Sequence, residues 1–288
     1  MKPAQFEYHD PTTTEEALAL LKQYGGEAKV LAGGQSLVPL MNFRLSRPAA
    51  LIDLNRIPAL AYIKEADGQL RFGAMTRQRV IERSDLVRSR IPLLTEATLL
   101  VGHLPIRTRG TIGGSVAHAD PAAEYPAVVT ALEGELVVRG SGGERRVSPE
   151  EFFVTYLTTS LGPDEMLTEV RLPIQPKGSG WAFEEFSRRH GDFAIVGIAA
   201  FLVVEGGRVK KARLATAGAG PIPIRLKAAE QILEAGRLDE KTFQEAGAKA
   251  QELVSPDADI HASADYRRHL TKVLTVRALR RAAAKIGG

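Results

Sequence analysis

Two short glycine-rich stretches carry the residues of this sequence that are best suited to hold a ligand. The first, AGGQS, occupies residues 32–36 after the apolar KVL, and the second, TIGGS, occupies residues 111–115. Each pairs two glycines, which lack a Cβ atom and permit close approach to the backbone, with short polar side chains. Such turns present backbone N–H groups to an anion. One pair alone is more often a tight turn, but two favour a diphosphate bracketed between two subdomains.

The common phosphate-binding loops are absent from the sequence. No GxGxxG opens a helix after a strand and no GxxxxGK[ST] is present, which excludes the dinucleotide fingerprint and the Walker loop. GAGPIPIR at residues 218–225 has prolines where the fingerprint needs helix-forming residues. We expect that stretch to be a structural turn between a strand and a helix.

Catalytic and metal-binding side chains are not grouped in the sequence. The absence of cysteine excludes disulfides, thiolate nucleophiles, cysteine-ligated iron-sulfur clusters and a cysteinyl-linked cofactor in this chain. The six histidines lack the close spacing of zinc or copper ligands. We therefore predict no catalytic residue and no bound metal, and any redox chemistry needs an organic cofactor.

Capping signals and apolar periodicity predict the elements that position the first glycine stretch. Thr12 and Thr13 each begin a capping-box spacing before the amphipathic EEALALLKQY, which predicts a helix that ends at a glycine pair. AKVLAG follows as a short buried strand, and the glycine turn then leads into a short helix in VPLMNFRL. Residues 50–54 form the next strand.

Hairpins and helices alternate through the rest of the chain. Hairpins are predicted for AYIKEADGQLRFGA and ELVVRGSGGERRVS, helices for MTRQRVIERS, for IPLLTEATLLVGH and from Pro121, and a closing strand for LTEVRLP. The linker QPKGSG at 175–180 is the clearest domain boundary. Beyond it we expect three strands, and then helices at 225–236, 239–252 and 264–285. The predicted fold class is α+β.

Composition and charge bound the class of protein. A chain of 288 residues with 44% apolar and 25% charged residues is typical of a globular protein of two or three domains. The sequence shows no transmembrane segment and no signal peptide, so we expect the cytoplasm. The net charge is +4, and seven basic residues crowd the last predicted helix: Arg267, Arg268, Lys272, Arg277, Arg280, Arg281 and Lys285. We interpret them as a solvated helix face, with an acidic partner as the next alternative; nucleic acid comes last because no aromatic residues are interleaved with the charges, and we expect none as a partner.

Three stretches resemble a known family. AGGQSLVPLMNFRL, RTRGTIGGSVAHADPAAEYPA and SRRHGDFA look like the FAD-binding medium subunit of the molybdenum hydroxylases, the group of carbon monoxide dehydrogenase, quinoline 2-oxidoreductase and xanthine dehydrogenase. The resemblance runs from FEYHDP to SADYRRHL. It implies a two-subdomain FAD-binding (PCMH-type) region at 1–56 and 57–176, followed by a C-terminal α+β domain of a three-stranded sheet and helices at 177–288.

The resemblance also implies a binding site for non-covalent FAD. Glu124 matches an acidic residue near the adenosine ribose, with a solvent-facing carboxylate as the alternative; Phe193 matches a residue that shields the isoalloxazine ring, with a core residue as the alternative. Glu184 falls where some relatives have a lysine near the flavin. The implied cofactor-binding residues are Lys29, Val30, Ala32, Gly33, Gly34, Gln35, Ser36, Leu37, Thr111, Gly113, Gly114, Ser115, Glu124, Leu167, Asp192 and Phe193. Whether the Gln35 amide touches FAD or only shapes its loop stays open.

Function and partners follow from the same resemblance. It implies an oxidoreductase subunit that takes electrons from the [2Fe-2S] clusters of a small subunit and passes them through FAD to NAD, quinone or oxygen. A large subunit would hold the molybdenum-pterin and select the substrate, and the complex would be a dimer of heterotrimers. Two alternatives are a self-standing flavoenzyme of the enolpyruvyl-sugar reductase type and a nucleotide-binding module without flavin.

Overall fold

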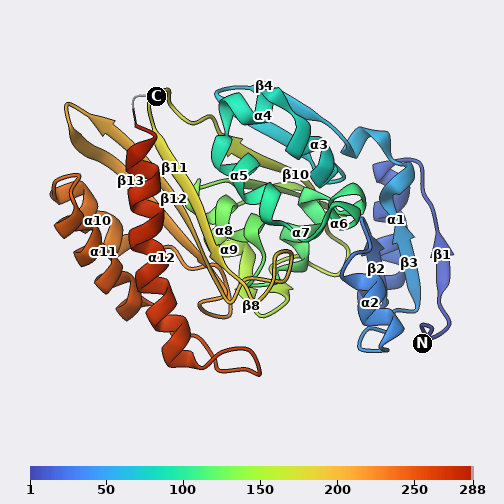
Figure 1. Cartoon of the computed structure of the whole chain (residues 1–288). Helices are drawn as coiled ribbons and strands as arrows, with labels where there is room; N and C mark the ends of the chain where they lie inside the picture. Colours follow the sequence, from blue (N-terminus) through green and yellow to red (C-terminus); the bar gives the residue numbers. More distant parts are fainter. Residues whose placement is uncertain (287–288) are drawn as a thin grey trace.

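The computed structural model describes residues 1–286 and arranges them around three main β-sheets (Figure 1). The first lobe, drawn in blue, holds a parallel sheet in the order β1-β3-β2. Its elements are β1 (Glu7–His9), α1 (Thr14–Tyr24), β2 (Ala28–Leu31), α2 (Leu37–Asn42) and β3 (Ala50–Asp53), with short 3-10 turns at Gly25–Glu27, Leu54–Arg56 and Pro58–Leu60.

The first lobe confirms the predicted helix-strand-turn-helix-strand order. Thr13, not Thr12, caps α1: its hydroxyl accepts from Glu16 N at 3.2 Å, and the Glu16 carboxylate accepts from the Thr13 backbone in return. The core of this lobe is not self-contained. Met75 and Met166, which belong to the second lobe, are buried in it, so the two lobes fold against each other.

The second lobe is built on an antiparallel sheet in the order β4-β5-β10-β6-β7. Both predicted hairpins are confirmed, the first with Asp67 and Gly68 at positive φ. Its elements are β4 (Ile63–Ala66), β5 (Gln69–Gly73), α3 (Gln78–Arg83), α4 (Asp85–Arg90), α5 (Pro92–Leu100), α6 (Leu104–Arg109), α7 (Ile112–His118), α8 (Glu124–Ala131), β6 (Glu135–Gly140), β7 (Gly143–Val147), α9 (Pro149–Phe152), β8 (Phe153–Thr155), β9 (Thr158–Thr159) and β10 (Met166–Pro173).

Two expectations for this lobe need correction. The helix expected from Pro121 begins only at Glu124, because Asp120 first forms a turn in which its carboxylate accepts from Ala122 N. The second glycine stretch is not a turn. Thr111 caps α7, with its hydroxyl accepting from Gly114 N at 3.0 Å, and both glycines lie in the first helical turn. The short helices α4 and α6 were not predicted from the sequence.

The C-terminal unit is a three-stranded antiparallel sheet between two helical layers (Figure 1). One face packs against α5 and α8 of the second lobe, and the other is covered by the first and third of the C-terminal helices, against which the second packs. Alternate residues divide between the two cores, as period-2 strands require: Phe183 joins the core of the second lobe and Ala182 the helical one. The elements are β11 (Gly180–Phe186), β12 (Val196–Glu205), β13 (Arg208–Ala217), α10 (Lys227–Ala235), α11 (Glu240–Leu253) and α12 (Ala264–Ala284).

The basic residues of α12 are not simply a solvated face. Arg267 is only 8% exposed and donates to Ile195 O and Gly218 O, while its other nitrogen pairs with Asp259 at 2.6 Å. Arg281 and Lys285 both pair with Glu96 of α5, at 2.6 and 2.5 Å. The predicted solvated face is therefore wrong for these three residues, which fix the helix to the rest of the molecule.

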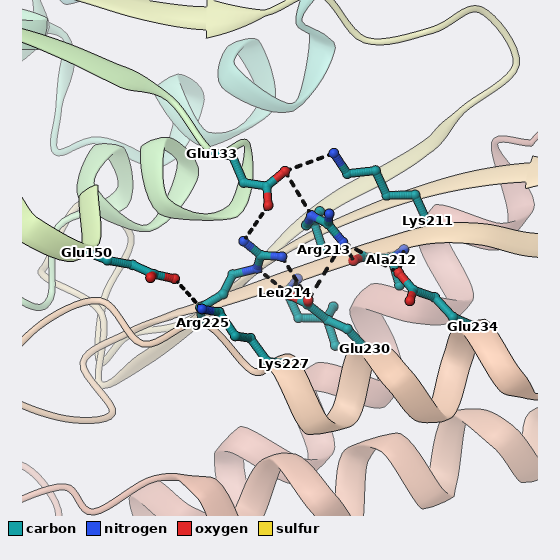
Figure 2. Close-up of polar contacts among 10 residues, drawn as sticks. All are labelled: Glu133, Glu150, Lys211, Ala212, Arg213, Leu214, Arg225, Lys227, Glu230 and Glu234. Carbon is teal, nitrogen blue, oxygen red and sulfur yellow. Dashed lines mark hydrogen bonds and ion pairs between the residues drawn. The ribbon is translucent and has the colours of Figure 1, made fainter. Parts of the chain in front are cut away.

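An ion-pair network joins the second lobe to the C-terminal unit (Figure 2). Glu133, which follows α8, accepts from Lys211 at 2.8 Å and pairs with Arg213 and Arg225 at 3.1 and 3.2 Å. Partial burial opposes ionisation of Glu133, but the Lys211 and Arg213 hydrogen bonds outweigh it and lower its pKa to about 2. Both carboxylate oxygens of Glu230 accept hydrogen bonds from the Arg225 guanidinium, at 2.5 and 2.8 Å.

Arg225→Met should lower the free energy of unfolding by about 3 kcal/mol, because it leaves the buried Glu230 carboxylate without its main partner. Arg225 and Glu230 are 8% and 5% exposed, respectively. The matched control is Lys227→Met, which breaks a 2.7 Å pair with Glu150 whose two side chains are 61% and 56% exposed. That change should cost under about 1 kcal/mol. Urea unfolding measures both; equal losses would contradict the account.

Candidate functional site

One cavity of about 810 Å³ lies where the two lobes meet the loop between β11 and β12. It is at the upper end of the range for small-molecule sites. The sixteen residues predicted to bind the cofactor all line this cavity. They are Lys29, Val30, Ala32, Gly33, Gly34, Gln35, Ser36 and Leu37 from the first lobe, Thr111, Gly113, Gly114, Ser115, Glu124 and Leu167 from the second, and Asp192 and Phe193 from the loop.

The first glycine segment, residues 32–37, offers free backbone donors. Among residues 1–286, no carbonyl or side chain accepts from the five successive amides of Gly33 to Leu37. Gly34 has φ +72, a conformation that favours glycine, and it turns the chain from β2 into α2. The Gln35 side chain donates to Gly33 O at 2.9 Å, so its amide braces this loop. The segment forms a concave set of N–H groups suited to an anion.

The second glycine segment, residues 111–115, does not repeat this arrangement. The amides of Ile112 and Gly113 donate to Thr76 O and Ala74 O at 3.0 and 2.9 Å, and those of Gly114 and Ser115 donate back to Thr111. The prediction that both segments present free N–H groups is therefore wrong for the second. This segment forms a close wall of the cavity, which Ser115 also lines.

The two segments pack directly against each other. A Cβ atom at Gly33 would lie 2.7 Å from Gly110 Cα and closer still to Arg109 O, so no other residue fits there without moving the backbone. A Cβ atom at Gly114 would lie 3.3 Å from Cβ of Ala32. Glycine at these positions lets strand β2 of the first lobe approach the start of α7 in the second.

The loop between β11 and β12 closes the other end of the cavity. A Cβ atom at Gly191 would meet His103 at 2.7 Å from Nδ1, so this glycine allows the loop to rest on the second lobe. Phe193 is 58% exposed, which excludes the alternative that it is a core residue. Leu167 on β10 is buried at the same cavity. Glu184 does not line it and pairs instead with Arg281 at 2.5 Å.

Buried carboxyl groups set the electrostatics near this end. Glu124 is 4% exposed, which excludes a solvent-facing role, and no other residue among 1–286 hydrogen-bonds to its carboxyl. Desolvation raises its pKa to about 7. Burial, together with the charge of Glu124, raises the pKa of Glu185 to about 8, and one oxygen of Glu185 is buried without a partner. Burial also lowers the pKa of His118.

Sequence reasoning missed one whole wall of the cavity. Residues 157–167, which run from the end of β8 into β10, supply Thr159, Gly162 and Glu165 in addition to Leu167. The loop before α6 adds Gly102, at φ +47. A Gly-Pro pair at 162–163 signals a turn, but nothing in these residue types distinguishes a binding wall from a surface loop.

The cavity fits a neutral or anionic organic cofactor and not a protein-held metal ion. Within residues 1–286 no group of three or more histidine or acidic side chains is placed to hold a metal. Five free amides suit a diphosphate, and the Glu124 carboxyl, which bonds to no other residue among 1–286, can accept from a hydroxyl. The residues present therefore fit FAD, whose phosphates need donors and whose ribose offers hydroxyls.

Comparisons with known proteins define the class of protein to which this chain belongs. Residues 4–175 match the family of the FAD binding domain in molybdopterin dehydrogenase, and residues 181–282 match the CO dehydrogenase flavoprotein C-terminal domain. The fold and the matched domains thus define an oxidoreductase flavoprotein subunit with FAD as its cofactor. The chain belongs to the family of FAD-binding medium subunits of molybdenum hydroxylases.

Individual relatives agree with that assignment over the full length. The chain is 42% identical to the 6-hydroxypseudooxynicotine dehydrogenase complex subunit alpha of Paenarthrobacter nicotinovorans, over 98% of this chain and 96% of that protein. Its structure is similar to that of carbon monoxide dehydrogenase from Hydrogenophaga pseudoflava, with a TM-score of 0.98, 39% identity and 100% of both chains covered. Quinoline 2-oxidoreductase from Pseudomonas putida 86 gives a TM-score of 0.94 at 36% identity, covering 99% of each chain. The nucleotide-module hypothesis, which assumed no flavin, is therefore wrong.

Within residues 1–286, no helix is both long enough and apolar enough to span a membrane.

Glu124 should make the FAD-free chain less stable as the pH rises. Its folded pKa of about 7 lies above the ordinary 4.5, so the folded form binds the proton more tightly, and the free energy of unfolding falls as the pH rises from about 4.5 to 7. The fall is about 3 kcal/mol for a shift of this size.

Glu124→Gln should remove that part of the pH dependence, as followed by urea unfolding at pH 5 and pH 8. Glu150→Gln changes a side chain that is 56% exposed and serves as the control, which should keep the wild-type slope. An unchanged slope in Glu124→Gln would contradict the assignment of the titration to this carboxyl.

Proposed function

We propose that this chain is the FAD-binding electron-transfer subunit of a molybdenum hydroxylase complex. In this role it receives electrons from the [2Fe-2S] clusters of a small subunit and delivers them to an external acceptor. The observation that carries the proposal is the run of five free amides, Gly33 to Leu37, at a cavity shared by both lobes and the Phe193 loop. The relatives that match nearly the whole chain are named as subunits or medium chains of complexes, which supports this proposal over a self-standing flavoenzyme.

The chain's own residues hold and orient the cofactor. The amides of 33–37 donate to the diphosphate oxygens and so stabilise their negative charge. No cluster of lysines is needed for this. Glu124 accepts from a ribose hydroxyl, and Leu167, Asp192 and Phe193 surround the isoalloxazine ring. Bound FAD supplies the capacity to take up electrons one at a time and release them as a pair. No acid, base or nucleophile of this chain is required.

The proposal includes two partner subunits. The relatives are named as subunits of complexes, such as the caffeine dehydrogenase subunit beta of a Pseudomonas strain and the carbon monoxide dehydrogenase medium chain. We infer a large molybdenum-pterin subunit that selects the substrate, a small iron-sulfur subunit, and assembly as a dimer of heterotrimers in the cytoplasm. The acceptor is NAD, quinone or oxygen. The proposed division is 1–56 and 57–176 for the two FAD-binding subdomains and 177–288 for the C-terminal domain.

Gly33→Ala should weaken FAD binding by about tenfold or more, because its methyl group would push the first segment away from Gly110. Gly26→Ala is the matched control: Gly26 also lines the cavity, but a Cβ atom there meets only Pro163, at 3.9 Å. Flavin content after purification and titration of the FAD-free chain followed by flavin fluorescence measure both. Equal affinity in the two variants would remove Gly33 from the site.

The subunit assignment is tested by co-expression with the neighbouring genes. The chain should elute together with two further subunits, one carrying iron and sulfide and the other molybdenum, in equal amounts. Acid precipitation of this complex should release all of the FAD, since the chain has no cysteine to tether it. A flavin-loaded chain that always elutes alone would contradict the role as a subunit.

A further inference from the structure

Two polar side chains lie behind the contact between the glycine segments. Asn55 belongs to the short turn after β3 in the first lobe, and Arg77 immediately precedes α3 in the second. Neither lines the 810 Å³ cavity; both line a separate, smaller one of about 210 Å³. They are therefore close to the binding site without being able to touch a cofactor seated in it.

These side chains form a continuous hydrogen-bonded link between the two glycine segments. The Asn55 side chain donates through Nδ2 to Ala32 O at 3.0 Å, and its Oδ1 accepts from Nη2 of Arg77. Nη1 of the same guanidinium donates to Arg109 O. Ala32 and Arg109 adjoin the two glycines, Gly33 and Gly110, whose backbones make the close contact. The link thus spans the lobe boundary at the place where the cavity walls meet.

Both ends of the link are fixed in their own lobes. The Asn55 backbone donates to Asp53 Oδ1 at 2.9 Å, and Asp53 in turn accepts from the Tyr8 hydroxyl of β1 at 2.7 Å. On the other side, Arg77 forms an isolated antiparallel bridge with Thr111. A force that separates the segments is therefore resisted by the sheet of the first lobe and by the capped start of α7.

We propose that Asn55 and Arg77 are positioning residues that hold the two glycine segments at their binding separation. The Gly33 contact only limits how near the segments come, because bare Cα and carbonyl atoms attract each other weakly. The link supplies the attraction. Arginine suits the task since its planar guanidinium holds two donors in a fixed geometry, whereas lysine offers one compact ammonium group on a flexible stem. Without it, fewer molecules have both walls in place, and the apparent affinity for FAD falls by that fraction.

This inference rests on the proposed binding of FAD in the cavity, and its test separates the two. Titrating FAD into the FAD-free full chain, followed by flavin fluorescence, gives the dissociation constant for wild type, Asn55→Ala, Arg77→Met, Arg77→Lys and the double variant Asn55→Ala/Arg77→Met. The matched control is Arg90→Met, which removes a 3.0 Å pair with Glu65; neither residue lines the cavity. Thermal unfolding of each FAD-free variant reports its stability.

Arg77→Met and Asn55→Ala should each weaken FAD binding by about tenfold, Arg77→Lys by less, and the double variant by no more than the weaker-binding single one, because the two residues act as one unit. Arg90→Met should bind as wild type while losing similar thermal stability. The inference would be overturned if the FAD dissociation constant of Arg77→Met or Asn55→Ala stayed within twofold of the wild-type value. It would also be overturned if Arg90→Met lost as much FAD affinity as these variants. If Arg77→Met does not fold, Asn55→Ala decides. Wild-type chain that binds no FAD would instead overturn the proposed function.

Discussion

The close approach of two backbones, at Gly33 in the first lobe and Arg109–Gly110 in the second, is the constraint on which the rest of the site depends. It is a contact that only a residue without a Cβ atom permits. Because of it, the end of β2 and the start of α7 form adjoining walls of one cavity. The lobes are also joined by Met75 and Met166, which complete the core of the first lobe, and by the hydrogen-bonded link of Asn55 and Arg77. Apolar burial holds the lobes together, and the glycine contact sets how they meet.

The two glycine segments look alike in sequence and differ in physical role. The first leaves five amides free because Gly34 turns the chain sharply before α2 begins. The amides of the second donate to Ala74 O and Thr76 O, which follow β5, and to Thr111, so this segment stabilises the wall and offers no comparable set of donors. This division explains how a site for a dianionic diphosphate can work beside several carboxyl groups: the donors are concentrated on one side, and the buried Glu124 faces the cavity with a raised pKa.

The sequence predicted the elements with strong local signals. The Thr13 capping box, the Asp67–Gly68 hairpin and the three long C-terminal strands all appear where expected. It also predicted which residues gather at one cavity, since the resemblance covered motifs from distant parts of the chain. The sequence did not predict the features that depend on tertiary contacts. The sequence pattern predicts Arg267 as a surface charge, but the side chain is buried and donates to backbone carbonyls. The amides of 112–115 donate to partners that no local sequence pattern reveals.

We expect the first glycine segment to supply the diphosphate donors while the second supplies a wall. A crystal structure of the chain with FAD tests it most directly, at a resolution that places the phosphate oxygens. The account predicts oxygens about 2.7–3.2 Å from at least two of the amides of 33–37, with the amides of 112–115 still bonded within the protein. A diphosphate held by the amides of 112–115, or one bound outside residues 33–37, would contradict it.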